Sequence, residues 1–372
     1  MEGLPSSDLR PQSIRELNLP YRAAWVGLGC FNHGVYRIQL RTDRAFTILV
    51  DGQPYNALTQ SLMGALSFTM VGMNGMDFTA VPSTASALLG GSGPRQADPT
   101  KVVFFMQGGG ACFDATTCTP GSGPYKTTTG ASDDPTNLSG VFDFDDGRNP
   151  LADYSFVFAP YCTGDVHLGN ATREYGPELT VQHKGSVNAT TALNDLVTQF
   201  PDTAQLVVTG ESAGSLPTPL YAGLAHDLLP NAEITVLADG SGALPVAPAI
   251  NAVLAQAWGA ESAIPPGPEI VGDTATWSSP DLFVQSHKHA PEIIFGRHDY
   301  AFDGVQQFFL GLLGIAAADV VTLIDQNETY IEAGGVDLRS YIAPGQGHTV
   351  LSSPTFYTEA VEGVLLVDWV TG

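Results

Sequence analysis

The chain has 372 residues, of which 44% are apolar, so it is long enough to fold into one large α/β domain or two smaller ones. Its 15 Lys and Arg residues stand against 38 Asp and Glu residues, for a net charge of −23, which repels nucleic acids and anionic membranes. We therefore expect neither as a partner, and no apolar stretch is long and unbroken enough to predict a transmembrane span.

The first part of the chain predicts a short β-structure. Residues 1–34 are polar with scattered prolines and are interpreted as an N-terminal extension. Apolar and polar residues alternate over 35–40 and 46–50, and the turn residues Asp51 and Gly52 follow. This pattern predicts an antiparallel hairpin at the start of the fold.

From residue 102 onward the chain alternates between short apolar runs and helical stretches. Helices are predicted at 188–200 and 213–229, and strands are predicted at 102–106, 154–159, 205–209, 234–238, 292–295 and 338–342. Continuous apolar strands between helices predict a mostly parallel central sheet covered by helices on both faces. We predict one domain over 1–372, with a cap-like insertion at about 240–290 that is rich in Ala, Pro and Trp.

The strongest chemical signal is Ser212, in the sequence Gly210-Glu211-Ser212-Ala213-Gly214. The motif follows a predicted strand and precedes a predicted helix. In that setting the glycines allow a sharp turn that lifts the serine oxygen clear of the sheet, as a nucleophile requires. The alternative is a plain glycine-rich turn, because G-x-S-x-G alone is common.

A second glycine-rich segment follows the predicted strand at 102–106. Gly108, Gly109 and Gly110 let the backbone turn its N–H groups toward a ligand. An oxyanion hole in this type of fold takes one N–H from such a loop and one from the residue after the nucleophile. The candidates are Gly109 or Gly110, together with Ala213; a flexible loop is the alternative.

A serine hydrolase of this type carries its acid and base later in the chain, in the order Ser, Asp, His. His348 lies in a glycine-rich loop directly after the last predicted strand, where the base belongs. His287 and His289 stand in a polar stretch and are interpreted as solvated.

The residues alone leave the acid open among three candidates. Asp299 and Asp303 both follow the predicted strand at 292–295, and Asp239 follows the strand before it. Each of the three preserves the chain order and could reach His348. Spacing does not separate them.

Five short segments resemble the pectin acetylesterase family, which includes the Notum-type carboxylesterases. They are, in order, GGGACFDATTC, YCTGD, GESAGS, LADGSG and FDGVQ, and they span about residues 100–350. The resemblance implies an α/β-hydrolase fold with Ser212, Asp303 and His348 as the catalytic triad. It also implies a disulfide between Cys112 and Cys118 and a second between Cys30 and Cys162.

The sequence departs from the family pattern at two points. The family's tryptophan after the glycines is absent, and Gly110 and Ala111 stand there instead. The last glycine of the family's serine motif is Ser215. A missing indole beside the oxyanion loop is expected to reshape the acyl pocket, so specificity for acetyl groups on pectin does not follow from the resemblance.

We therefore predict a serine carboxylesterase that forms a covalent acyl-enzyme and acts on acyl or acetyl esters, either small or polymeric. No cofactor is expected, and no His or Cys pair has the spacing of a zinc motif. The alternatives are an acyltransferase, a lipase or polyester depolymerase, and an inactive binding protein with the same fold. The even cysteine count favours a secreted protein whose leader has been removed, with the cytosol as the alternative.

The predicted insertion carries aromatic residues with two interpretations. Trp258, Trp277 and Phe283 could form a platform for a sugar or an aromatic acyl group. The commoner role of such residues is to pack an insertion onto the core.

Overall fold

The computed structural model describes residues 97–129, 133, 135–267, 272–315 and 319–371, and four short strands before them. These strands form two antiparallel pairs: β1 (Ile48–Val50) with β2 (Gln53–Tyr55), and β3 (Phe68–Val71) with β4 (Asp77–Ala80). The first pair is antiparallel, with residues 48–50 opposite residues 53–55. Residues 35–40 of the predicted hairpin lie outside the described residues.

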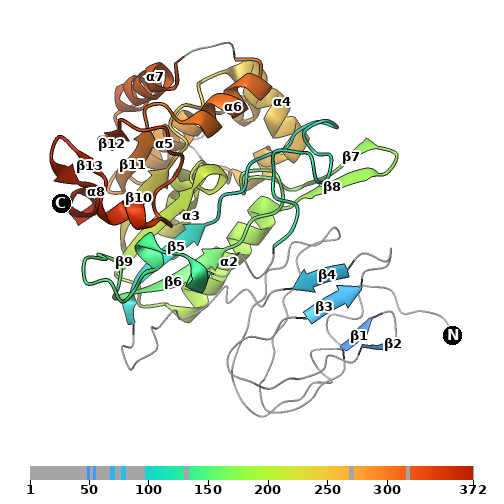
Figure 1. Ribbon diagram of the computed structural model, residues 1–372, viewed down its shortest axis with the longest axis horizontal. Helices are drawn as coiled ribbons and strands as arrows, with labels where there is room; N and C mark the ends of the chain where they lie inside the picture. Colours follow the sequence, from blue (N-terminus) through green and yellow to red (C-terminus); the bar gives the residue numbers. More distant parts are fainter. Residues whose placement is uncertain are drawn as a thin grey trace.

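A six-stranded parallel sheet forms the centre of the protein (Figure 1). Its order is β12-β11-β10-β9-β5-β6. The strands are β5 (Asp98–Met106), β6 (Tyr154–Ala159), β9 (Gln205–Glu211), β10 (Glu233–Asp239), β11 (Ile294–Tyr300) and β12 (Leu338–Ala343). The predicted α/β class and mostly parallel sheet are confirmed.

The order of the strands creates a switch point between β5 and β9. From β5 the chain moves outward to β6, and it then returns to β9 on the other side of β5 and continues toward β12. In open parallel sheets, ligands bind at the carboxyl ends of the strands beside such a point. Gly108–Gly110 and Ser212 follow directly from these two strands, so the topology brings them together.

One face of the sheet is covered by four helices. They are α2 (Gly185–Gln199), α3 (Thr218–Leu228), α5 (Ser279–His289) and α7 (Val320–Ala333). Alternate residues of the strands, such as Phe104 and Val208, point into this layer and are fully buried. This layer is the larger part of the hydrophobic core.

On the other face, where the sequence predicts a further helical layer, the described residues contribute little helix beyond the short segment Leu366–Thr371. Phe105, Phe156 and Phe158 pack there against Phe142 and the segments that follow β12. These segments comprise η7 (Pro354–Tyr357), the hairpin β13 (Ala360–Val361) and β14 (Val364–Leu365), and α8 (Leu366–Thr371). The turns η2 (Pro135–Asn137) and η3 (Gly140–Phe142) precede β6.

The segment 240–290 divides into two parts. Helix α4 (Pro248–Trp258) and the turns η5 (Ala260–Ala263) and η6 (Thr274–Thr276) lie beside the carboxyl edge of the sheet, whereas α5 packs in the helical layer against α3 and α7. The antiparallel hairpin β7 (Ala171–Gly176) and β8 (Leu179–His183) supports α4, because the Arg173 guanidinium donates to the carbonyls of Gln256 and Ala257. The division of the chain into a domain with a cap stays a prediction.

Two elements differ in extent from their predicted spans. Strand β11 runs on to Tyr300 through the buried polar residues Arg297, His298 and Asp299, where the sequence predicts a loop. Helix α3 begins at Thr218 rather than at 213, because the chain first makes the 3₁₀ turn η4 (Ser212–Gly214). Among the described residues, no helix combines the length and apolar character needed to cross a membrane.

Candidate active site

Ser212 occupies a strained turn between β9 and η4. Its φ angle is +54°, a left-handed conformation that costs an ordinary residue about 1–2 kcal/mol. The neighbouring glycines make the turn possible: a Cβ atom on Gly214 would lie 2.1 Å from the carbonyl oxygen of Met106 on β5. This is the strand-turn-helix context that the sequence predicts for a nucleophile.

His348 lies beside this turn, in the loop after β12, and borders the same pocket as Ser212. Its Nδ1 is hydrogen-bonded to Asp303 Oδ2 at 2.7 Å. Its Nε2 is buried and has no hydrogen-bond partner among the described residues. Asp303 thus orients the imidazole through Nδ1, and Nε2 is left to form a hydrogen bond with another group at the pocket.

Asp303 is fixed at the N-terminus of α6 (Gly304–Leu312). Besides His348, it accepts hydrogen bonds from the backbone N–H groups of Val305 and Gln306 and from the Gln306 side chain. Burial raises the pKa of Asp303, but the hydrogen bond and charge of His348 outweigh burial and leave the pKa below its usual value. The carboxylate is therefore ionised at neutral pH and oriented toward the imidazole.

The other two candidate acids have different partners. Asp299 is fully buried and accepts from Gly242 N and from Gln306 Nε2. Asp239 accepts from Val350 N and Leu351 N, which fixes the chain just beyond His348. Of the three carboxylates, only that of Asp303 is hydrogen-bonded to His348 in the structure.

Asp239 also belongs to a buried ion network. His298 lies between two carboxylates, with Nδ1 2.7 Å from Asp239 Oδ1 and Nε2 2.7 Å from Glu359 Oε1. Burial lowers the pKa of His298, but the hydrogen bonds and charges of the two carboxylates raise it to about 10 overall. A charged imidazole thus ties β10 and β11 to the C-terminal segment.

This network predicts a loss of stability at alkaline pH. Because the folded-state pKa of His298 lies above its ordinary value of 6.5, its contribution is full below about pH 6.5 and is lost as the pH rises toward 10. We expect the free energy of unfolding, from urea titrations at pH 7 to 10, to fall more steeply in the wild type than in His298→Gln. Equal slopes would contradict the prediction.

Glu211, the residue before Ser212, supports the same loop. Its carboxylate accepts hydrogen bonds from the backbone N–H and the hydroxyl of Ser352. Burial is the main cause that raises the pKa of Glu211 to about 7, and the nearby charge of Asp239 adds to it. Glu211 is not among the site residues predicted from the sequence, although its place inside the serine motif is a usable signal.

The glycine loop after β5 has the backbone shape expected of an oxyanion loop. Gly109 and Gly110 have φ angles of +152° and +73°, which favour glycine, and a Cβ atom on Gly110 would meet the Pro124 carbonyl at 1.9 Å. The Tyr161 hydroxyl donates to the Gly110 carbonyl at 2.9 Å. Gly110 and Ala213 both border the pocket beside Ser212, and Ala213 stands in the first turn of η4, where N–H groups have no acceptor within the helix.

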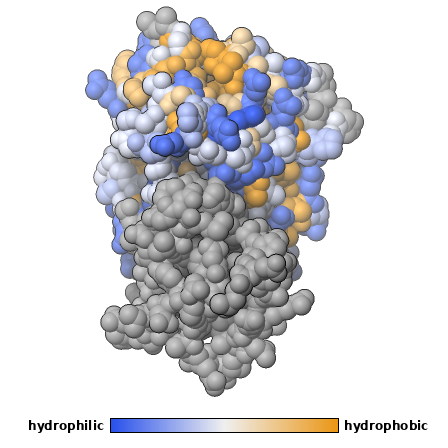
Figure 2. Space-filling model, turned by 90° about the vertical axis from the view of Figure 1, so that its right-hand side faces the viewer, coloured by the Kyte–Doolittle hydropathy of each residue, from blue (hydrophilic) through white to orange (hydrophobic). Residues whose placement is uncertain are grey.

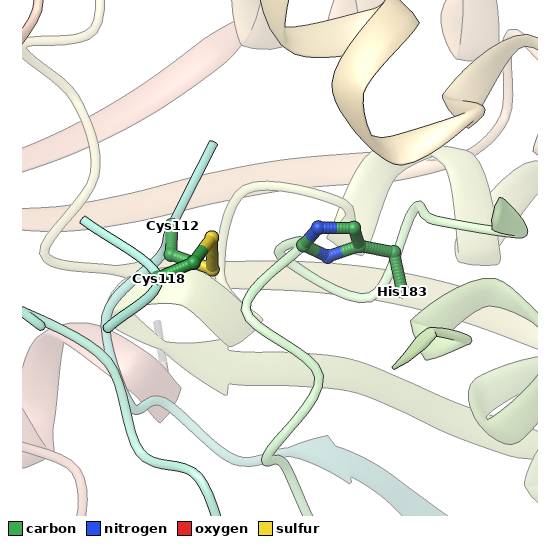
Figure 3. A group of neighbouring side chains, drawn as sticks. All are labelled: Cys112, Cys118 and His183. Atoms are coloured by element: carbon green, nitrogen blue, oxygen red, sulfur yellow. A yellow bond between two sulfur atoms is a disulfide. The ribbon is translucent and has the colours of Figure 1, made fainter. Parts of the chain in front are cut away.

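A disulfide closes the loop that follows these glycines. Cys112 and Cys118 are bonded to each other and fully buried, which confirms that pairing. His183 lies close to the two sulfurs (Figure 3), but its Nδ1 is taken by the Thr163 carbonyl and its Nε2 by the Tyr175 hydroxyl. This group is therefore not arranged to hold a metal ion. Cys30, of the second predicted pairing with Cys162, lies outside the described residues.

An apolar pocket extends from the serine. It encloses about 600 Å³, its open mouth included, and its walls include Val166, Leu216, Leu254, Trp258, Phe309 and Leu313. A second hollow of about 820 Å³ shares several of these walls and continues to Ile264 and Trp277. Carbon atoms dominate both surfaces.

The three aromatic residues of the segment 240–290 have separate places. Trp258 is buried between the pocket and the disulfide loop, where its Nε1 donates to the Cys112 carbonyl at 2.7 Å. Trp277 borders the second hollow. Phe283 packs against Phe295 in the core, so the three do not form one platform.

Comparison with known proteins identifies the family to which the central segment is related. A family model described as pectinacetylesterase matches residues 92–246. This segment is similar to the pectinacetylesterase family. It includes the glycine loop, the disulfide and Ser212, whereas Asp303 and His348 lie beyond it. The pectinacetylesterase family consists of ester-hydrolysing enzymes.

The solved structure of the Wnt deacylase Notum from Drosophila is similar to this pectinacetylesterase-related chain. It aligns with 73% of this chain and 83% of its own, at 15% identity and a TM-score of 0.52. A second crystal form of Notum aligns over the same shares at 16% identity and a TM-score of 0.48. At 15% identity, the similarity to this Notum structure is evidence for a shared fold alone. A search of curated protein sequences found no match.

Proposed function

We propose that this protein is a serine carboxylesterase with Ser212, His348 and Asp303 as its triad. One observation carries the proposal: Ser212, on its strained turn, shares a pocket with His348, whose Nδ1 is held by Asp303 and whose buried Nε2 has no hydrogen-bond partner in the described part of the chain. This arrangement supports Ser212 as nucleophile, His348 as base and Asp303 as acid, in the chain order that serine hydrolases of this type use. The pectinacetylesterase match over Ser212 supports the same reaction class.

In the proposed reaction Ser212 Oγ attacks the ester carbonyl carbon while His348 Nε2 accepts its proton. The N–H groups of Ala213 and of Gly110 or Gly109 stabilise the negative oxygen of the tetrahedral intermediate. The C–O bond to the alcohol breaks, and His348 gives its proton to the leaving alkoxide. Water, deprotonated by His348, then attacks the acyl-enzyme. The bond between the acyl carbon and Ser212 Oγ breaks, His348 returns the proton to Ser212 Oγ, and the carboxylic acid leaves.

The pocket supports an apolar acyl group larger than acetyl. Its walls are carbon-rich, and its continuation toward Trp277 leaves room for a chain of several methylenes. Each buried methylene contributes about 0.8 kcal/mol of binding. The family's tryptophan beside the oxyanion loop is absent, and Ala111 instead borders the pocket.

The surroundings of the pocket support a substrate that is uncharged and poorly soluble, such as an aliphatic polyester or a lipid ester. Residues 240–260 and 304–318 contain no Asp, Glu, Lys or Arg, in a chain of net charge −23. Val253 on α4 and Phe308 on α6 are 58% and 52% exposed. Hydrophobic residues gather at the upper end of the molecule (Figure 2), where Figure 1 places α4 and α6.

We further propose that the enzyme acts outside the cell. The Cys112–Cys118 disulfide supports this, because such bonds persist mainly in oxidising compartments. The net charge of −23 also supports secretion, because a strong negative charge keeps a protein soluble and prevents its molecules from associating with one another.

Hydrolysis of a p-nitrophenyl ester series from acetate to palmitate tests the proposal. We expect turnover by the wild type, with kcat/KM highest at a chain longer than acetate, because the apolar pocket binds added methylenes. A maximum at acetate would contradict the acyl-group proposal and leave the esterase proposal standing. No turnover with any ester would reject both.

Filling the pocket should change the chain-length preference. Leu254 lines both hollows, so Leu254→Trp is expected to lower kcat/KM for long-chain esters by about tenfold or more and to leave acetate hydrolysis nearly unchanged. Val253→Trp is the matched control. Val253 directly precedes Leu254 on α4, but its side chain is mostly exposed to solvent. Equal effects of the two substitutions would exclude this pocket as the acyl site.

A further inference from the structure

The C-terminal ends of α3 and α5 bring together four side chains that the esterase reaction does not use. His226 and Asp227 belong to α3, His289 ends α5, and Glu292 follows shortly after. Asp227 Oδ1 lies 2.7 Å from His289 Nε2 and 3.8 Å from His226 Nδ1. The ligand atoms of His226, Asp227 and His289 all lie within 4.8 Å of one another.

These separations suit a tetrahedral metal ion. Zinc binds imidazole nitrogen and carboxylate oxygen at about 2.0–2.2 Å, which places neighbouring ligand atoms roughly 3.4 Å apart. The distances of 2.7 and 3.8 Å lie on either side of that value. Small adjustments of these partly exposed side chains would therefore bring the ligand atoms to the spacing that a zinc ion needs.

The two nitrogens of His226 have the arrangement of a metal-binding histidine. Its Nδ1 is buried, has no hydrogen-bond partner among the described residues and lies 3.8 Å from Asp227 Oδ1. Its Nε2 lies 2.6 Å from Glu292 Oε1 on the opposite side of the ring. In metal sites the nitrogen that does not bind the ion commonly donates to a carboxylate, which fixes the tautomer and orients the ring.

The electrostatic setting also favours a cation. The carboxyl ends of α3 and α5 meet here, and each carries the partial negative charge of a helix C-terminus. The protein as a whole has a net charge of −23. Side-chain exposures of 23% for His226 and 52% for Asp227 leave the group open to an ion from solution.

We propose that His226, Asp227 and His289 bind a divalent transition-metal ion such as Zn²⁺, with Glu292 orienting His226 and water completing the coordination. Asp227 lies nine residues along α3 from Thr218, or about 14 Å of helix, and Ser212 lies at the other end. The ion therefore joins two helices of the layer that supports the serine turn and takes no part in acyl transfer.

Zinc titration of the full chain, stripped of metal by EDTA and dialysed, tests the site. We expect one Zn²⁺ per chain by calorimetry and a rise in Tm of about 5 °C at a hundredfold excess over Kd. His226→Ala and His289→Ala should lose both effects, with Asp227→Asn as a milder third variant. His287→Ala is the matched control, because it removes an imidazole from the same helical turn and keeps the site.

The proposal is overturned if the wild type binds no zinc, or if the variants retain the same stoichiometry and Tm shift as the control. Circular dichroism identifies any variant that fails to fold. Neither readout uses ester hydrolysis, so this test is independent of the proposed activity.

Discussion

Ser212→Ala is expected to lower kcat for ester hydrolysis by about 10⁵-fold or more while leaving the protein folded. The covalent route is lost because alanine has no hydroxyl group to attack the ester. Alanine is small enough for that position, and the left-handed φ of +54° is strained equally for serine and alanine, so Tm should change little. Initial rates on the best p-nitrophenyl ester, together with thermal unfolding, measure both effects.

Ser241→Ala is the control for this experiment. Ser241 lines the same pocket but stands after β10 and has no place in the proposed triad. Its substitution should change kcat less than tenfold, and a fluorophosphonate probe should label this variant as it labels the wild type. Labelling that survives in Ser212→Ala would assign the nucleophile elsewhere, and a wild type that resists the probe would favour an inactive binding protein.

Asp303→Asn is expected to lower kcat by about 10⁴-fold at neutral pH. The carboxylate accepts a hydrogen bond from His348 Nδ1, so it selects the tautomer whose Nε2 can accept the serine proton. An amide at position 303 can donate to Nδ1 instead and favour the wrong tautomer. It also removes the negative charge that stabilises the imidazolium in the transition state.

The other two carboxylates provide the comparison. Asp299→Asn should cost no more than about tenfold in kcat, because Asp299 contacts Gln306 and Gly242 rather than His348. Asp239→Asn should lower Tm more than Asp299→Asn or Asp303→Asn does. It weakens both the ion pair with His298 and the hydrogen bond that Asp239 accepts from the Val350 backbone. A larger loss of kcat in Asp299→Asn than in Asp303→Asn would overturn the choice of acid.

The sequence by itself determined the strands of the sheet and the positions of the serine turn, the glycine loop and the base loop. These features depend on local physics. A short apolar run bounded by turn residues favours a buried strand, and the positive φ angles of Gly109 and Gly110 favour glycine at those two positions. The Cys112–Cys118 pairing was implied by the family resemblance. The two cysteines are only six residues apart, so the loop between them closes easily.

The spacing of residues left open which carboxylate meets His348; the family resemblance implied Asp303, and the tertiary structure has Asp303 hydrogen-bonded to His348. Asp239, Asp299 and Asp303 all lie at the ends of neighbouring strands, and the paths of the loops determine which one faces the imidazole. The extension of β11 was not predicted for a related reason. His298 is polar, and it is buried in the strand only because Asp239 and Glu359, each about 60 positions away in the chain, form hydrogen bonds with it. The His226 and His289 group likewise joins segments far apart in the chain. Such contacts arise from long-range packing, which no local pattern of residues records.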